Sequence, residues 1–267
     1  MTFQEFWRVP ARAGKRLLRI DLVLVPVALL AFLLAWDVVV RWQEYPPFIL
    51  PAPERVWGRF LALAGDGTLL YHAMTTLGEI FAGLALGLTV ATVIGYGLAK
   101  SPLLERILSP YIVASQAVPI VALAPLLVIW FGFGGLSKVL VCALTVFFPA
   151  LVNTIVGIRS VEPDLRALMR SLQATSWQTF ALLEVPAALP VLLAGLKVAV
   201  TLAVIGAVVG EFVGADRGLG FLVNLARGTL DTPMLFVALF VLVAIALGLY
   251  TAVSLLEHFV LRWRRAT

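Results

Sequence analysis

The sequence is poor in charged residues. Only 13% of its 267 residues are Asp, Glu, Lys or Arg, against about 25% in soluble domains, and 61% are hydrophobic. A water-soluble domain of this length has no core large enough to bury so much apolar surface. The composition therefore excludes an ordinary soluble protein and indicates a membrane protein.

Metal ligands and common enzyme motifs are also scarce. The chain has one cysteine, Cys142, and two distant histidines, His72 and His258, so neither an intramolecular disulfide nor a zinc-ligand pattern is possible. We interpret Cys142 as a buried packing residue. No GxSxG, HExxH or GxxxxGK[ST] motif occurs, and the glycines of 214–220 lack the lysine of a phosphate loop. We therefore expect no enzyme activity and no cofactor on this chain.

Six apolar stretches are long enough to cross a bilayer core, which takes about 20 helical residues. They cover about 22–40, 78–99, 111–131, 139–158, 191–213 and 234–260, the third being interrupted by Pro119 and Pro125. No small-residue cleavage site follows the first stretch, so we interpret it as a retained span rather than a signal peptide. The expected fold class is an all-α polytopic membrane protein with six transmembrane helices.

Basic residues predict which side of the membrane each connection faces. Both ends of the chain are basic, and further arginines lie between the fourth and fifth stretches. By the positive-inside rule, we expect cytoplasmic N and C termini and a cytoplasmic segment 159–184. The chain would then have tails at 1–21 and 261–267 around one transmembrane domain, 22–260. The net charge of +5 forms no basic stripe, so we expect no nucleic-acid partner.

The connection between the fourth and fifth stretches carries helix signals of its own. Pro163 and Asp164 suit the first turn of a helix, and the sequence 175–178, Thr-Ser-Trp-Gln, is a capping box. The pattern predicts two short helices with apolar faces. Such faces suit a groove on a partner protein, or alternatively the lipid surface.

Polar residues inside the apolar stretches are candidates for a transport path, because lipid-facing polar groups are costly. The candidates are Gln116, Asn153, Glu211, Glu79 and Thr76. Glu211 is alternatively a helix-end charge or the structural partner of a loop arginine. The alternative for Gln116 and Asn153 is a hydrogen bond between helices.

The sequence 183–190, Leu-Glu-Val-Pro-Ala-Ala-Leu-Pro, followed by Ala-Gly-Leu-Lys at 194–197, resembles the end of the EAA loop of ABC importer permeases. The nitrate, sulfonate and taurine branch is the most similar. It also shows Pro-Ile-Val-Ala-Leu-Ala-Pro-Leu at 119–126, Trp-Phe-Gly at 130–132, a late glutamate such as Glu211, and Gly-Leu-Gly at 218–220. Leu-Pro-Ala-Pro at 50–53 resembles its short extracytoplasmic entry segment.

The resemblance implies a type I importer permease fold in the inner membrane of a prokaryotic cell. It also implies a second permease copy, an extracytoplasmic substrate-binding protein, and two cytoplasmic subunits that use Mg-ATP. The EAA-type loop, about 159–190, would couple the ATPase subunits to alternating access. The residues expected at this coupling surface are Leu165, Arg166, Met169, Leu172, Gln173, Thr175, Trp177, Phe180 and Pro186.

Some positions depart from the family pattern. The usual Glu-Ala-Ala and Gly of the loop are replaced by Ala-Leu-Met at 167–169 and by Gln173, and Glu79 replaces a frequent basic residue. The family carries sulfonates, taurine and nitrate, but also riboflavin and thiamine pyrimidines. Because the spans show no cluster of Lys or Arg, we favour a neutral or weakly charged nutrient. The alternative function is a secondary transporter that is not driven by ATP.

Overall fold

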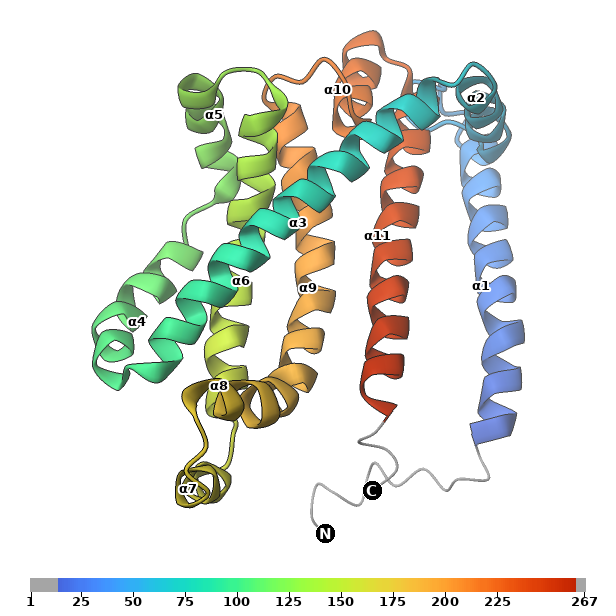
Figure 1. Ribbon diagram of the computed structural model, residues 1–267. Helices are drawn as coiled ribbons and strands as arrows, with labels where there is room; N and C mark the ends of the chain where they lie inside the picture. The colour runs from blue at the N-terminus through green and yellow to red at the C-terminus, as the bar shows by residue number, and fades with distance from the viewer. Residues whose placement is uncertain (1–13, 263–267) are drawn as a thin grey trace.

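The computed structural model describes residues 14–262, and every regular element among them is a helix (Figure 1). The long helices are α1 (Gly14–Trp42), α3 (Thr68–Lys100), α6 (Gly135–Arg159), α9 (Val185–Phe212) and α11 (Thr232–Val260). The shorter ones are α2 (Pro53–Gly65), α4 (Pro102–Gln116), α5 (Ile120–Phe131), α7 (Pro163–Ser171), α8 (Ser176–Thr179), the π-helical turn η1 (Phe180–Glu184) and α10 (Leu219–Thr229). The all-helical fold class is confirmed for this part of the chain.

Helices α3, α6 and α9 form the packed centre of the protein, and small residues let them approach closely. A Cβ atom on Gly87 would lie 2.7 Å from the carbonyl oxygen of Ala143, and one on Gly206 would lie 2.8 Å from Cys142 Cα. Cys142 is fully buried between these helices, as its interpretation as a packing residue requires. Gly83 and Gly87 form a GxxxG spacing, which is typical of such close contacts between helices.

Among the described residues, four helical segments have the length and composition of a membrane span. They are α3, α6, the continuous α8–η1–α9 segment and α11. A fifth unit is formed by α4 and α5, which meet at an angle of 92°. The expected interruption of the third stretch at Pro119 is confirmed, since the chain bends between Gln116 and Ile120, but Pro125 lies inside α5 and the helical unit begins earlier than expected, at Pro102. Proline disfavours the helical conformation of the residue before it, which explains a break at Pro119.

Two other boundaries differ from the expectation. α3 begins at Thr68, ten residues before the apolar run, so polar residues such as His72 belong to the helix. The segment 214–233, which connects the fifth and sixth apolar stretches, contains the 11-residue helix α10. Gly214 and Gly218 have φ values of 145° and 108°, a region that favours glycine, and they make the turn before α10. The expected tails, 1–21 and 261–267, lie largely outside the described residues. α1 begins at Gly14.

The long helices run between two opposite ends of the molecule, and the shorter helices lie mainly near these ends (Figure 1). We call the end formed by α2, α5 and α10 the α10 end. The opposite end, which we call the α7 end, carries α7 and α8. The beginning of α1 at Gly14 and the end of α11 at Val260 also lie there. At the α10 end, α1 contacts α11 through the stacked rings of Trp36 and Phe236, whose centroids are 5.2 Å apart.

Candidate functional site

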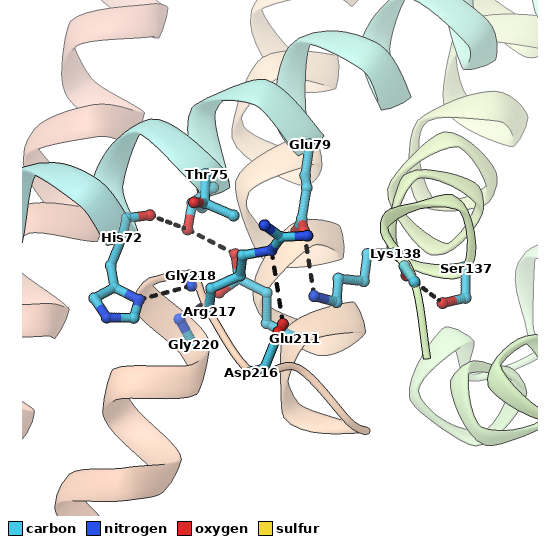
Figure 2. A network of polar contacts seen from close by, with 12 residues as sticks. His72, Thr75, Glu79, Ser137, Lys138, Glu211, Asp216, Arg217, Gly218 and Gly220 are labelled. Carbon is cyan, nitrogen blue, oxygen red and sulfur yellow. Dashed lines mark hydrogen bonds and ion pairs between the residues drawn. The ribbon is translucent and has the colours of Figure 1, made fainter. Parts of the chain in front are cut away.

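At the α10 end, buried side chains hold the first turn of α10 (Figure 2). The backbone N–H groups of residues 218, 219 and 220 donate, in that order, to His72 Nδ1 (2.9 Å), Thr76 Oγ1 (2.8 Å) and Glu211 Oε2. The Thr76 hydroxyl donates to Glu211 Oε1 at 2.6 Å. The free N–H groups that begin a helix are thus satisfied by side chains of α3 and α9, and a carboxylate lies at the positive end of the helix dipole.

A buried ion pair lies beside these contacts. Lys138 of α6 is 2% exposed, and its Nζ lies 3.5 Å from Glu79 Oε1. Glu79 Oε2 has no hydrogen-bond partner in the described structure. The two buried carboxyl groups are therefore stabilised by different partners. Glu79 faces Lys138, whereas Glu211, which is 1% exposed, faces the start of α10.

We call this set the α10 anchor: His72, Thr76, Glu79, Lys138, Glu211 and the backbone of 218–220. It explains the Gly-Leu-Gly sequence, because a Cβ atom on Gly220 would lie 2.8 Å from Glu211 Oε2. Three candidate path residues, Thr76, Glu79 and Glu211, are brought together here and are buried. His72 and Lys138 were not predicted as site residues from the sequence. Lys138 could have been predicted, because a lysine next to an apolar stretch of a membrane protein is costly unless it has a partner.

The other two path candidates lie apart from the anchor. Asn153 borders a cavity of about 180 Å³ between α3, α6 and α9, and its side chain makes no hydrogen bond within the described residues. A larger cleft of about 620 Å³ adjoins this cavity and shares Thr92, Thr154 and Leu192 with it. Gln116 is exposed at the end of α4, next to the 92° bend.

The two short helices expected at 159–190 are present, and their ends follow the local sequence. Thr175 and Gln178 form both hydrogen bonds of the capping box, at 3.2 and 2.8 Å. α7 ends in a Schellman arrangement, in which Ala174 N–H donates to Met169 O and Gln173 N–H donates to Arg170 O. Gln173 has φ 53°, so the angle between α7 and α8 is made by the residue that replaces the family glycine.

The expected coupling residues differ in what they contact. Leu165, Leu172 and Trp177 are exposed apolar side chains, the last two by 68% and 71%. Arg166 instead points back, and its Nη2 donates to Ile158 O of α6 at 2.6 Å. Met169 and Pro186 are half-buried. The surface open to a partner is therefore smaller than the expected residue set.

The short helices are also tied to α3. The rings of Phe180 and Tyr96 meet edge-on, with centroids 5.2 Å apart. Glu184, which is 1% exposed, accepts a hydrogen bond from Tyr96 Oη at 3.1 Å and forms an ion pair with Lys100. A π-helical turn at 180–184 lies between α8 and α9, a distortion frequent at functional sites. Movement of α8 would therefore be passed to both α3 and α9.

The fold and these sites define a polytopic α-helical membrane protein with a buried polar anchor at one end and short, exposed amphipathic helices at the other. Residues 83–265 match the family described as "Binding-protein-dependent transport system inner membrane component", and the chain belongs to this family.

Several curated relatives are similar along most of the chain. The riboflavin transport system permease protein RibX of Chloroflexus aurantiacus is 46% identical, over 90% of this chain and 89% of the relative. The formylaminopyrimidine transport permease protein ThiX of Halalkalibacterium halodurans is 36% identical, over 88% and 94%. The taurine transport system permease protein TauC of Escherichia coli is 32% identical, over 90% of both chains. The expected class, a permease subunit of an ABC importer, is confirmed.

A solved structure shows the same fold. An inward-facing structure of the MetNI methionine ABC transporter matches with a TM-score of 0.61, covering 70% of this chain and 93% of that chain. The sequence identity is 19%, so this likeness carries the fold alone.

Proposed function

We propose that this chain is the membrane-spanning subunit of an ATP-driven importer for a heteroaromatic nutrient of the riboflavin type. The 46% identity to a riboflavin transport permease, over nine tenths of the chain, carries the proposal. α1 contains the apolar run 22–40 and supplies the sixth span beside the five units described above. Both termini and the α7 end then face the cytoplasm, with the α10 end outside the inner membrane of a prokaryotic cell.

The remaining parts of the transporter follow from the two ends. At the α7 end, Leu165, Leu172 and Trp177 offer an exposed apolar surface for two ATPase subunits, which bind Mg-ATP. At the α10 end, α2, α5 and α10 form the surface for an extracytoplasmic binding protein. A second copy of the chain completes the path. Phe180, Tyr96 and Glu184 transmit the movement of the ATPases to α3 and α9.

The candidate path residues take different parts in this proposal. Asn153 and Gln116 line the path, the first at its cavity and the second beside the bend of α4 and α5. Thr76, Glu79 and Glu211 act on the path indirectly, because they fix α10 and the outer ends of α3 and α9 to one another.

The charges of the spans favour a substrate without strong charge. The lysines of α3, α6 and α9 are all paired with carboxylates: Lys100 with Glu184, Lys138 with Glu79, and Lys197 with Glu257. None of these three is left to hold a sulfonate or a nitrate ion. This observation favours riboflavin or a thiamine pyrimidine over taurine.

Reconstitution tests the proposal. The permease, its ATPase and its binding protein would be placed in proteoliposomes, and uptake of riboflavin, formylaminopyrimidine and taurine would be measured with and without ATP. We expect ATP-dependent uptake of riboflavin. Uptake of taurine but not of riboflavin would contradict the proposed substrate, and uptake driven by an ion gradient without ATP would favour a secondary transporter.

A further inference from the structure

A continuous groove runs along α3, α6 and α9 toward the α7 end. It consists of the cavity beside Asn153 and the larger cleft below it, which share three lining residues. We call it the Asn153 groove. Its walls include Thr92 and Tyr96 of α3, Asn153 and Thr154 of α6, and Trp177 and Phe180 at the base.

Unpaired polar groups occur in this groove. The side chains of Asn153 and Thr92 make no hydrogen bond within the described residues, although the surroundings are spans of apolar side chains. An amide without a partner is costly in an apolar region unless water or a ligand satisfies it. One side of Asn153 packs closely against α9, because a Cβ atom on Gly195 would lie 2.7 Å from Asn153 Nδ2, and the residue also borders the cavity of about 180 Å³. The amide is thus held in place with its hydrogen-bonding capacity unused.

Aromatic rings form the other end of the groove. Phe180 meets Tyr96 edge-on at 5.2 Å and Trp177 at 5.4 Å, so three rings lie in one cluster. Such rings contact flat aromatic molecules favourably through stacked or edge-on arrangements. The groove therefore joins an apolar aromatic wall to a single carboxamide, an arrangement that suits a ring system with one polar edge.

We propose that the Asn153 groove binds the heteroaromatic ring of the transported substrate, with the Asn153 carboxamide paired to the edge of a pyrimidine ring. The proposal rests on the proposed function, since riboflavin and formylaminopyrimidine share a pyrimidine ring and taurine has none. A carboxamide offers a donor and an acceptor side by side, and rotation by 180° fits it to either order on the ring edge. The Thr92 hydroxyl is the second hydrogen-bonding partner of the ring, after the Asn153 carboxamide. Tyr96 and Phe180 contact the apolar part of the ring.

Two variants and one control test this site in the assembled transporter. Asn153→Leu keeps the side-chain size and removes both hydrogen-bonding groups, whereas Thr92→Val removes one exposed hydroxyl with little risk to folding. Thr251→Val makes the same type of change on the exposed surface of α11, where Thr251 bonds only its own helix. Riboflavin binding to the detergent-solubilised permease–ATPase complex would be followed by quenching of flavin fluorescence, and the half-saturation of uptake would be measured in proteoliposomes.

We expect Asn153→Leu to raise the riboflavin Kd and the half-saturation concentration about tenfold, as the loss of one or two buried hydrogen bonds predicts. Thr92→Val should raise both roughly twofold to threefold, and Thr251→Val should leave them unchanged. Thr251→Val, which lies outside the groove, should also leave ATP hydrolysis without substrate at the wild-type rate.

Two other results would count against the site in different ways. If the wild type imports riboflavin and both groove variants bind and transport it equally well, the groove is not the substrate site, although the proposed function stands. If the wild type imports taurine and neither pyrimidine compound, the proposed substrate itself is wrong.

Discussion

The two ends of the molecule differ in how much of their surface is closed by contacts within the chain. At the α10 end, nearly all groups of the α10 anchor have partners inside the chain, and the helices are bound to one another by side chains from α3, α6 and α9. At the α7 end, Trp177 is exposed, and the groove that runs toward this end holds the unpaired amide of Asn153. The comparison indicates that the buried contacts at the first end fix helices to one another, whereas the second end carries apolar surface that is suited to the proposed ATPase subunits.

The largest effect is expected from Lys138→Met. The substitution leaves the buried Glu79 carboxylate without its counter-charge, which we expect to cost about 3–5 kcal/mol of stability. The measurement is thermal unfolding of the detergent-solubilised permease, followed by size-exclusion chromatography. The double variant Glu79→Gln, Lys138→Met should recover most of the loss. A single variant as stable as the wild type would show that this ion pair does not stabilise the α10 end.

A smaller loss is expected from Glu211→Ala. It removes the acceptor of the residue 220 N–H group and of the Thr76 hydroxyl, and both donors are buried. We expect a loss of about 3 kcal/mol, since each unsatisfied buried group costs about 1–3 kcal/mol. The matched control, Glu211→Gln, keeps one acceptor and should lose less. The same thermal assay would contradict the anchor if Ala and Gln behaved alike.

At the other end, Trp177→Ala should weaken association with the ATPase by about 2 kcal/mol, roughly thirtyfold, while leaving permease stability unchanged. Phe180→Ala should affect both quantities, because Phe180 also packs on Tyr96. Pull-down of the ATPase at equal permease expression measures the first quantity, and thermal unfolding measures the second. Full association of the double variant would remove these residues from the coupling surface.

The smallest effect is expected from Gln173→Gly. Gln173 holds a left-handed conformation, which costs a non-glycine residue about 1–2 kcal/mol. Glycine removes this cost, but its greater freedom in the unfolded chain offsets part of the stabilisation. We expect a stabilisation of about 1 kcal/mol or less, with unchanged ATPase association. Gln173→Val should be destabilising. Destabilisation by glycine would contradict the strain assigned to this turn.

Local signals explain what the sequence could predict. The capping box at 175–178 and the helix start at Pro163 depend on neighbouring residues, and the structure contains both. α10 was not predicted because the glycines around 214–220 are typical of a loop. In the structure, Gly214 and Gly218 form only the turn before the helix. Family resemblance, rather than periodicity, supplied the ABC permease class.

Long-range pairing explains what the sequence could not show. His72 accepts a hydrogen bond from a residue 146 positions away, and the partners Glu79 and Lys138 lie in different helices. No local pattern reports such a partner. The same reason applies to Asn153: its residue type marks it as a path candidate, but only the packing of α3, α6 and α9 shows that its amide is unpaired.

The most direct test of the account is the side of the membrane that the α7 end faces. A Ser176→Cys variant in a Cys142→Ala background carries one thiol, on the exposed α8 helix. We predict that a membrane-impermeant thiol reagent labels it only from the cytoplasmic side, and that bound ATPase protects it. Labelling from the extracytoplasmic side in intact cells would contradict the assignment of both ends of the molecule.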